Sequence, residues 1–123
     1  MTINNIYLSE YERMWLEHMF KKDFLYRDQM VNQINHSKIE HKYFGNLISL
    51  KFSADRKISP MDIYIRVPLE MRVYKKSKPP IQFLLHVING YINELEIFYA
   101  DSSCIEDEFK ILYDDSTEVI FNE

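Results

Sequence analysis

The sequence predicts an α+β domain in which an N-terminal helix pair packs on a mainly antiparallel β-sheet with a central hairpin at Asn89 and Gly90. Apolar residues recur at helical spacing in the first 35 residues, and alternating strand patterns follow them. The Asn-Gly pair between two such strand patterns is the strongest short hairpin signal in the chain. A length of 123 residues suits one domain that covers residues 1–123.

The first helix is predicted over residues 9–22. Ser9 and Glu12 have the spacing of a capping box, in which each side chain accepts a hydrogen bond from the other residue's backbone N–H. A second helix is predicted from Asp23, as its N-cap, to about residue 35. Its inward-facing residues are predicted to be Phe24, Met30, Val31 and Ile34.

Strands are predicted where β-branched and aromatic residues alternate with polar ones, over residues 47–52, 62–67, 71–74 and 117–121. Pro68 cannot donate to a ladder, which indicates an edge position or a bulge beside the second of them. Prolines and charges make residues 75–80 a loop, and residues 104–109 are a candidate helical turn.

The central hairpin is expected to have a two-residue loop, because a type I′ turn needs positive φ at both central residues. That loop pairs Ile88 with Tyr91, His86 with Asn93 and Leu84 with Leu95. The opposite face then holds Phe83, Leu85 and Val87 beside Ile92, Glu94 and Glu96. A loop longer by one residue would change this assignment.

Composition excludes several classes of protein. The single cysteine, Cys104, cannot form an internal disulfide, which favours a reducing compartment. No run of apolar residues is long enough for a membrane span, and the N-terminus does not read as a signal peptide. With only two glycines, a phosphate-cradling loop is not expected, and we find no catalytic motif. We therefore expect a cytoplasmic, non-enzymatic protein without a cofactor.

Charge is distributed unevenly along the chain. Residues 1–90 hold 14 Lys and Arg against 9 Asp and Glu, whereas residues 91–123 hold 1 against 10. An acidic patch with interleaved aromatic residues is typical of a surface that docks a basic partner, although a solvated acidic tail is the alternative. The predicted partner-binding residues are Glu94, Glu96, Tyr99, Asp101, Glu106, Asp107, Glu108, Tyr113, Asp114 and Asp115.

Glu94 and Glu96 also permit other interpretations. Two residues apart on a strand, they point the same way, and paired carboxylates can perform acid–base chemistry. They can equally face Arg66 or Arg72 across the sheet, or face water. A small ligand-binding or hydrolytic domain is therefore the alternative function, and an oligomerising module that uses residues 117–121 is a third.

Other candidate sites have weaker support. His36, Glu40 and His41 lie close together in sequence, but their spacing suits neither a helix face nor a strand, so we expect no metal. His18 and His86 lie among apolar residues and are expected to be core histidines. The lysines of the 75–78 loop are expected to be solvated, because nucleic-acid binding normally needs a basic domain.

The hairpin region, with residues 81–87, Gly90, residues 94–98 and residues 101–103, resembles a widespread bacterial family of small proteins of unknown function. Residues 8–20, with Glu12 at their centre, and residues 66–70 match the layout of the same family. The resemblance implies a compact α+β fold and no particular activity. Cys104 departs from it, since family members often have proline there.

Small acidic proteins of this kind are similar, as a class, to immunity proteins of bacterial toxin systems, including contact-dependent inhibition. This similarity implies a protein that binds a cognate toxin domain, often a basic nuclease, and blocks its active site. The expected partner is thus a protein toxin with a basic surface, and neither a nucleic acid nor a membrane.

Overall fold

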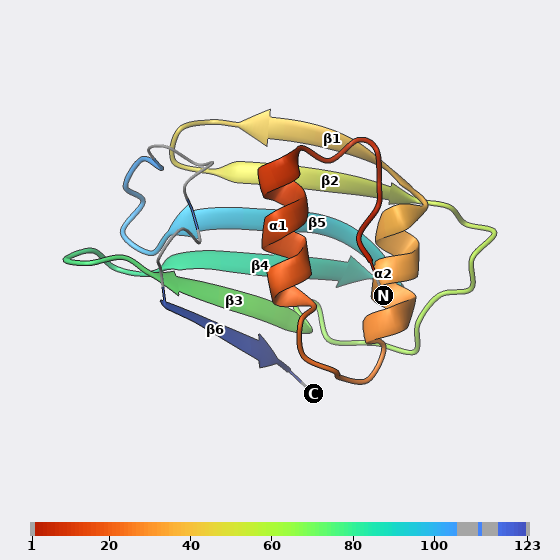
Figure 1. Ribbon diagram of the computed structural model, residues 1–123. Coiled ribbons are helices and arrows are strands. Elements are labelled where there is room, and N and C mark those ends of the chain that lie inside the picture. The colour runs from red at the N-terminus through yellow and green to blue at the C-terminus, as the bar shows by residue number, and fades with distance from the viewer. Residues whose placement is uncertain (1, 106–110, 112–115, 123) are drawn as a thin grey trace.

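The computed structural model describes residues 2–105, 111 and 116–122, and there it shows two helices and one six-stranded sheet (Figure 1). The helices are α1 (Glu10–Met19) and α2 (Arg27–Asn35). The strands are β1 (Ser37–Tyr43), β2 (Ile48–Ala54), β3 (Leu69–Tyr74), β4 (Ile81–Ile88), β5 (Tyr91–Tyr99) and β6 (Ser116–Phe121). Their order is β1-β2-β5-β4-β3-β6, and every neighbouring pair is antiparallel. The predicted α+β class is confirmed.

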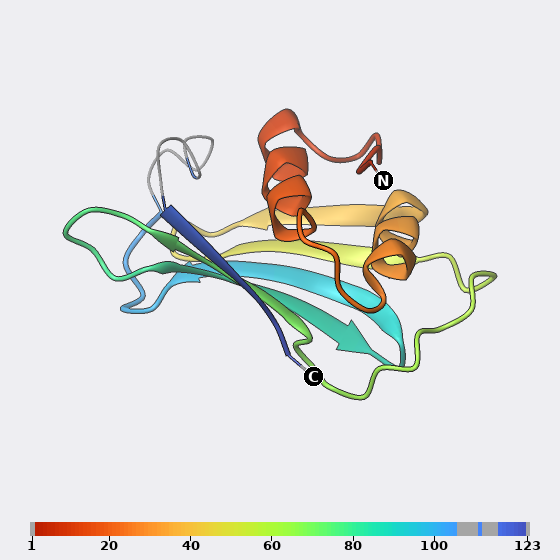
Figure 2. The ribbon, with the colours of Figure 1, turned by 60° about the horizontal axis from the view of Figure 1, so that its bottom comes forward.

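Both helices lie against one face of the sheet (Figure 2). Along β4 the buried residues Ile81, Phe83, Leu85 and Val87 alternate with partly exposed ones, as a strand with one covered face requires. Trp15 of α1 is fully buried, and its ring packs edge-to-face against that of Phe83, with 5.8 Å between the ring centroids. The core therefore lies between helices and sheet. We call the other sheet face, which no described helix covers, the open face.

The first predicted helix is confirmed together with its cap. The Ser9 hydroxyl accepts from the Glu12 backbone N–H at 3.2 Å, and the Glu12 carboxylate accepts from the Ser9 N–H at 2.8 Å. The second helix is confirmed, but the prediction that Asp23 caps it is wrong. The N-cap is Tyr26, which has φ 72° and no capping side chain. Residues 23–25 instead belong to the connection, where the Phe24 ring stacks on Phe121 at 4.7 Å.

Residues 62–67 were predicted as a strand, and this is wrong. Prolines at 60 and 68 bracket the segment, which makes isolated backbone hydrogen bonds to the end of the hairpin. The Met61 N–H donates to the Gly90 carbonyl and the Val87 N–H to the Arg66 carbonyl, both at 2.8 Å. The strand β1 was not predicted, because charges at positions 38, 40 and 42 and the polar His41 hide its alternation.

The hairpin turn is confirmed, with φ of 53° at Asn89 and 79° at Gly90, and Ile88 pairs with Tyr91. Beyond it a β-bulge shifts the register, so that His86 pairs with Glu94. The predicted pairs of His86 with Asn93 and of Leu84 with Leu95 are therefore wrong: Leu84 pairs with Glu96. The bulge consequently moves both carboxylates away from the core.

Helix α2 contacts the hairpin next to this bulge through Gln33, whose side chain is fully buried. The Gln33 amide donates to the Gly90 carbonyl at 3.0 Å, and its oxygen accepts from the Ile92 N–H at 2.8 Å. A buried backbone N–H needs such a partner where the ladder is interrupted. The second helix is thus tied to the turn end of the hairpin by two buried hydrogen bonds.

Candidate functional site

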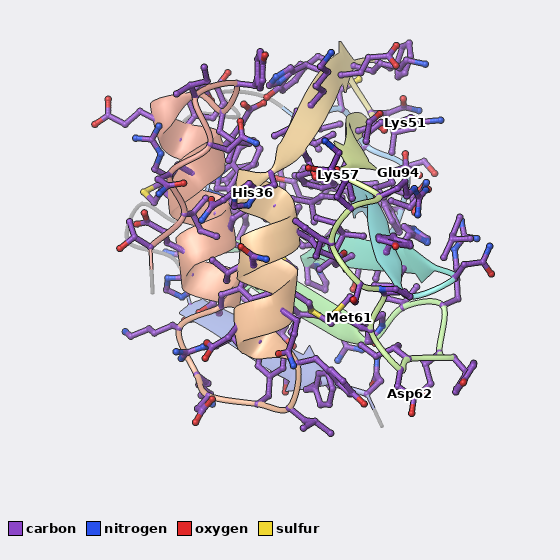
Figure 3. All side chains as sticks on the ribbon, turned by 90° about the vertical axis from the view of Figure 1, so that its right-hand side faces the viewer. His36, Lys51, Lys57, Met61, Asp62 and Glu94 are labelled. Carbon is purple, nitrogen blue, oxygen red and sulfur yellow. The ribbon has the colours of Figure 1, made fainter. Side chains whose placement is uncertain are left out.

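The candidate site is a polar network on the open face, which we call the open-face network; its residues are Ser49, Arg66, His86, Glu94 and Glu96. Glu94 and Glu96 project from β5, one on each side of the buried Leu95. Figure 3 shows Glu94 and Lys51 on the side of the sheet away from both helices. The prediction that the two glutamates share a face is borne out.

Glu94 is held by strand β2. The Ser49 hydroxyl donates a short hydrogen bond to Glu94 Oε2, although in the ladder Ser49 lies opposite Glu96. The bond is therefore diagonal across the two strands. Ser49 is only 2% exposed, so its hydroxyl has little access to water and the bond fixes the direction of the carboxylate.

Glu96 is held from the other side, by β4. His86 Nε2 lies 3.0 Å from Glu96 Oε1, while the Nε–H of Arg66 donates to His86 Nδ1 at 3.2 Å. Because Nδ1 accepts a hydrogen bond, the proton of a neutral ring belongs on Nε2, which then donates to the carboxylate. A chain of two hydrogen bonds thus joins Arg66, His86 and Glu96.

Charges of both signs surround this network. Lys51 lies opposite Glu94 in the ladder, and Glu40 lies opposite Lys51 on the next strand. Toward the other edge, Arg72 donates to Glu118 at 3.1 Å. Arg66 thus approaches Glu96 through His86, whereas Arg72 has a different partner. The open face therefore presents a fixed pattern of alternating charges rather than a uniformly acidic patch.

The structure places the remaining predicted site residues elsewhere. Tyr99 was expected to anchor a partner, but it is only 5% exposed, and Lys78 Nζ lies 5.4 Å from its ring centroid. Its position on the covered face follows from the alternation of β5, so it has little surface to offer a partner. The expected residues Glu106, Asp107, Glu108, Tyr113, Asp114 and Asp115 lie outside the described residues.

Asp101 is exposed, as a surface contact requires, and it forms an Asx turn. Its carboxylate accepts from the Ser103 hydroxyl at 2.6 Å and from the Ser103 backbone N–H at 3.0 Å. These two bonds hold the pKa of Asp101 below its usual value. The side chain is accordingly a fixed anion just beyond the end of β5.

The histidines differ from expectation. His86 belongs to the open-face network and not to the core, because it alternates along β4 with the buried Leu85 and Val87. His18 lies at the end of α1, where Nε2 is 2.8 Å from the Thr117 hydroxyl. Burial, and next the charge of Lys21, lower the pKa of His18. Within the described part of the chain, no group of three potential ligands is arranged to hold a metal ion.

A second polar cluster, which the sequence did not reveal, joins α1 to β1. Glu12 is 1% exposed, and its Oε2 accepts from His41 Nδ1 at 2.8 Å and from the Tyr43 hydroxyl at 2.5 Å. Burial, followed by the hydrogen bond to Glu12, raises the pKa of Tyr43. Since Glu12 also completes the cap of α1, this cluster fixes the helix against the sheet edge.

Comparison of the chain with protein-family models, with curated proteins and with solved structures found no match. The resemblance to the bacterial family and the similarity to immunity proteins therefore stay predictions. Among the described residues there is no helix with the length and apolar character needed to cross a membrane.

Proposed function

We propose that this protein is a non-enzymatic binding protein, and more specifically an immunity protein that binds and occludes a cognate bacterial toxin domain in the cytoplasm. The observation that carries the proposal is the open-face network on a sheet face that no described helix covers, in which Glu94 and Glu96 each accept a hydrogen bond from a neighbouring strand. Side chains that are already ordered lose less conformational entropy when a partner binds.

The shape and charge of this surface suit a macromolecule. A sheet face is broad, and the network leaves a fixed pattern of carboxylates among Lys51, Arg66 and Arg72. Such a pattern discriminates between partners, because a wrongly placed charge on the partner is repelled. The acidic residues 91–123 add a long-range field that attracts a basic protein. Together, these features support a basic toxin domain as the partner.

The alternative is a small ligand-binding or hydrolytic domain that uses Glu94 and Glu96. The hydrogen bond from His86 to Glu96 favours it, because a carboxylate paired with a histidine is a common acid–base arrangement. Both carboxylates, however, are engaged by neighbouring side chains. The alternative therefore requires a substrate that displaces Ser49 or His86.

The test is capture of the protein encoded directly upstream by the tagged chain, at low and at high salt, with binding constants by calorimetry. We expect a complex that weakens with salt. The double variant Glu94→Gln, Glu96→Gln keeps both hydrogen-bond acceptors and removes both charges, so it should bind at least about tenfold more weakly. Glu17→Gln, on the exposed surface of α1, is the control for loss of a surface carboxylate.

No complex under either condition would contradict the immunity proposal. Equal affinity of the double variant and Glu17→Gln would show that the open face is not the binding surface. A small-molecule ligand or turnover that the double variant alone loses would favour the alternative function.

A further inference from the structure

Strand β1 lies at one edge of the sheet, and β2 is its one neighbour among the described strands (Figure 1). Two hydrogen bonds lie at the ends of the ladder between β1 and β2. The Asp55 N–H donates to the His36 carbonyl, and the Phe44 N–H donates to the Leu47 carbonyl. In an antiparallel ladder the direction of the backbone groups alternates. The even-numbered residues of β1 therefore bond to β2, and the N–H and C=O of Ile39, His41 and Tyr43 point outward.

The free edge begins after Ser37. The carbonyl of Ser37 also points outward, but it accepts from the Asn5 side chain at 2.7 Å. Among the described residues, the N-terminal segment thus occupies this end of the edge and leaves residues 39–43 open to another strand. Over these residues β1 has no proline and pairs with β2 without interruption.

The side chains of residues 39–43 are self-complementary about His41. The order is Ile39, Glu40, His41, Lys42 and Tyr43: apolar, acidic, histidine, basic, apolar. A two-fold axis at His41 places Glu40 opposite Lys42 of the other copy, twice. It also places Ile39 opposite Tyr43 of the other copy, twice. We propose that two copies of this chain pair antiparallel through β1 in this register, which joins their sheets into one.

The neighbouring registers that keep the outward groups paired are unfavourable. A shift by two residues in one direction sets Glu40 against its own symmetry mate and Lys38 against Lys42. The opposite shift sets Lys42 against its own symmetry mate. Like charges directly opposite each other destabilise a strand pair. Charged side chains normally protect a sheet edge from pairing, but here they select one register.

Apolar surface beside the edge adds to the contact. Tyr43 is 39% exposed and Phe44 is 62% exposed, although both are large apolar side chains. Ile39, also in this edge strand, is only partly buried against the core. The contact between two edges is nevertheless small, and we expect a weak, concentration-dependent dimer.

The test measures mass by analytical ultracentrifugation from about 10 µM to about 1 mM, a range suited to a weak interface. Wild-type protein should shift from monomer to dimer. Glu40→Lys and Lys42→Glu each set like charges opposite each other twice and should weaken the dimer at least about tenfold. The double variant that exchanges the two residues should restore it. Lys38→Glu is the control, because Lys38 has no charged residue opposite it in this register.

Hydrogen exchange gives an independent readout of the register. The amides of Ile39, His41 and Tyr43 should become protected as concentration rises, while those of residues 38, 40 and 42 are protected at every concentration. A wild-type protein that is monomeric throughout would overturn the proposal. Failure of the exchanged double variant to dimerise, with its circular dichroism unchanged, would overturn the register.

Discussion

At the scale of single residues, Gly90 is a position with no room for a side chain. Its φ is +79°, and a Cβ placed there would lie 2.3 Å from the Met61 carbonyl oxygen and 2.9 Å from the Met61 nitrogen. Both atoms are backbone, and the Met61 N–H donates to Gly90 itself, so the loop cannot move away without losing that bond.

We predict that Gly90→Ala lowers the free energy of unfolding by about 3 kcal/mol or more, the sum of left-handed backbone strain and overpacking. Gly45→Ala is the matched control, because Gly45 has φ +82° but open space around the added carbon. It should cost about 1–2 kcal/mol, from strain alone. Urea unfolding measures both, and equal losses would contradict the role of the Met61 contact.

His18 should make stability depend on pH. Its folded-state pKa lies below 6.5, so the unfolded chain takes up a proton more readily. The contribution of the neutral ring is therefore complete above about pH 6.5, and it is lost as the pH falls from there toward the folded pKa. His18→Gln, which can still bond to Thr117, should flatten this part of the profile.

The measurement is urea unfolding of both proteins between about pH 5 and pH 8, with the His18 ring titration followed by NMR. His36→Gln, at an exposed position, controls for the loss of a histidine. If the free energy of unfolding of His18→Gln decreases at pH values under 6.5 as steeply as that of the wild type, other groups cause the loss.

At the scale of secondary-structure elements, α2 and the β4–β5 hairpin depend on each other through Gln33. Gln33→Leu has a similar volume but leaves the Ile92 N–H without its partner in the interior. We predict a loss of about 2–3 kcal/mol in the free energy of unfolding. Asn32→Leu, at an exposed position of the same helix, is the control.

Amide exchange separates the bond itself from general destabilisation. In Gln33→Leu, the Ile92 amide should exchange faster than its neighbours in β5, because its acceptor is gone. Uniform acceleration along β5 would instead indicate that the whole sheet is weakened and that the loss is not specific to the Gln33 bond.

These elements also show why part of the fold was not predictable. The capping box of α1 and the Asn89-Gly90 turn depend on residues within four positions of each other, and both were predicted. The N-cap of α2 was not, because Tyr26 takes positive φ without any capping side chain. Residues 62–67 have a strand pattern. In the structure this segment lies beside Val87 and Gly90, where it makes isolated backbone hydrogen bonds and no ladder.

At the scale of the whole molecule, the uneven charge should govern association with the proposed toxin. Reversing Asp107, Glu108, Asp114 and Asp115 to Lys changes the formal net charge from −4 to +4. We predict that this variant folds but does not bind, because the attraction for a basic partner becomes repulsion. Calorimetry at low salt measures binding, and circular dichroism verifies the fold.

A second variant with the same net charge tests whether the position of the reversed charges or only the total charge affects binding. It reverses four exposed acidic residues that lie outside the acidic segment, residues 91–123: Glu17, Asp23, Asp28 and Asp62. It should keep most of its affinity if the acidic segment contacts the partner. Unchanged affinity of the first variant at low salt would disprove the electrostatic form of the proposal.

By itself, the sequence determined the fold class, the first helix with its cap, the hairpin turn and the shared direction of Glu94 and Glu96. Each of these follows from backbone geometry and side-chain periodicity over a few residues. Only the tertiary structure decided where those carboxylates lie. The bulge in β5 turns them to the open face, where bonds spanning 45, 20 and 10 positions join Ser49 to Glu94, Arg66 to His86 and His86 to Glu96. Such contacts depend on how strands align, and a one-residue shift reverses every side chain.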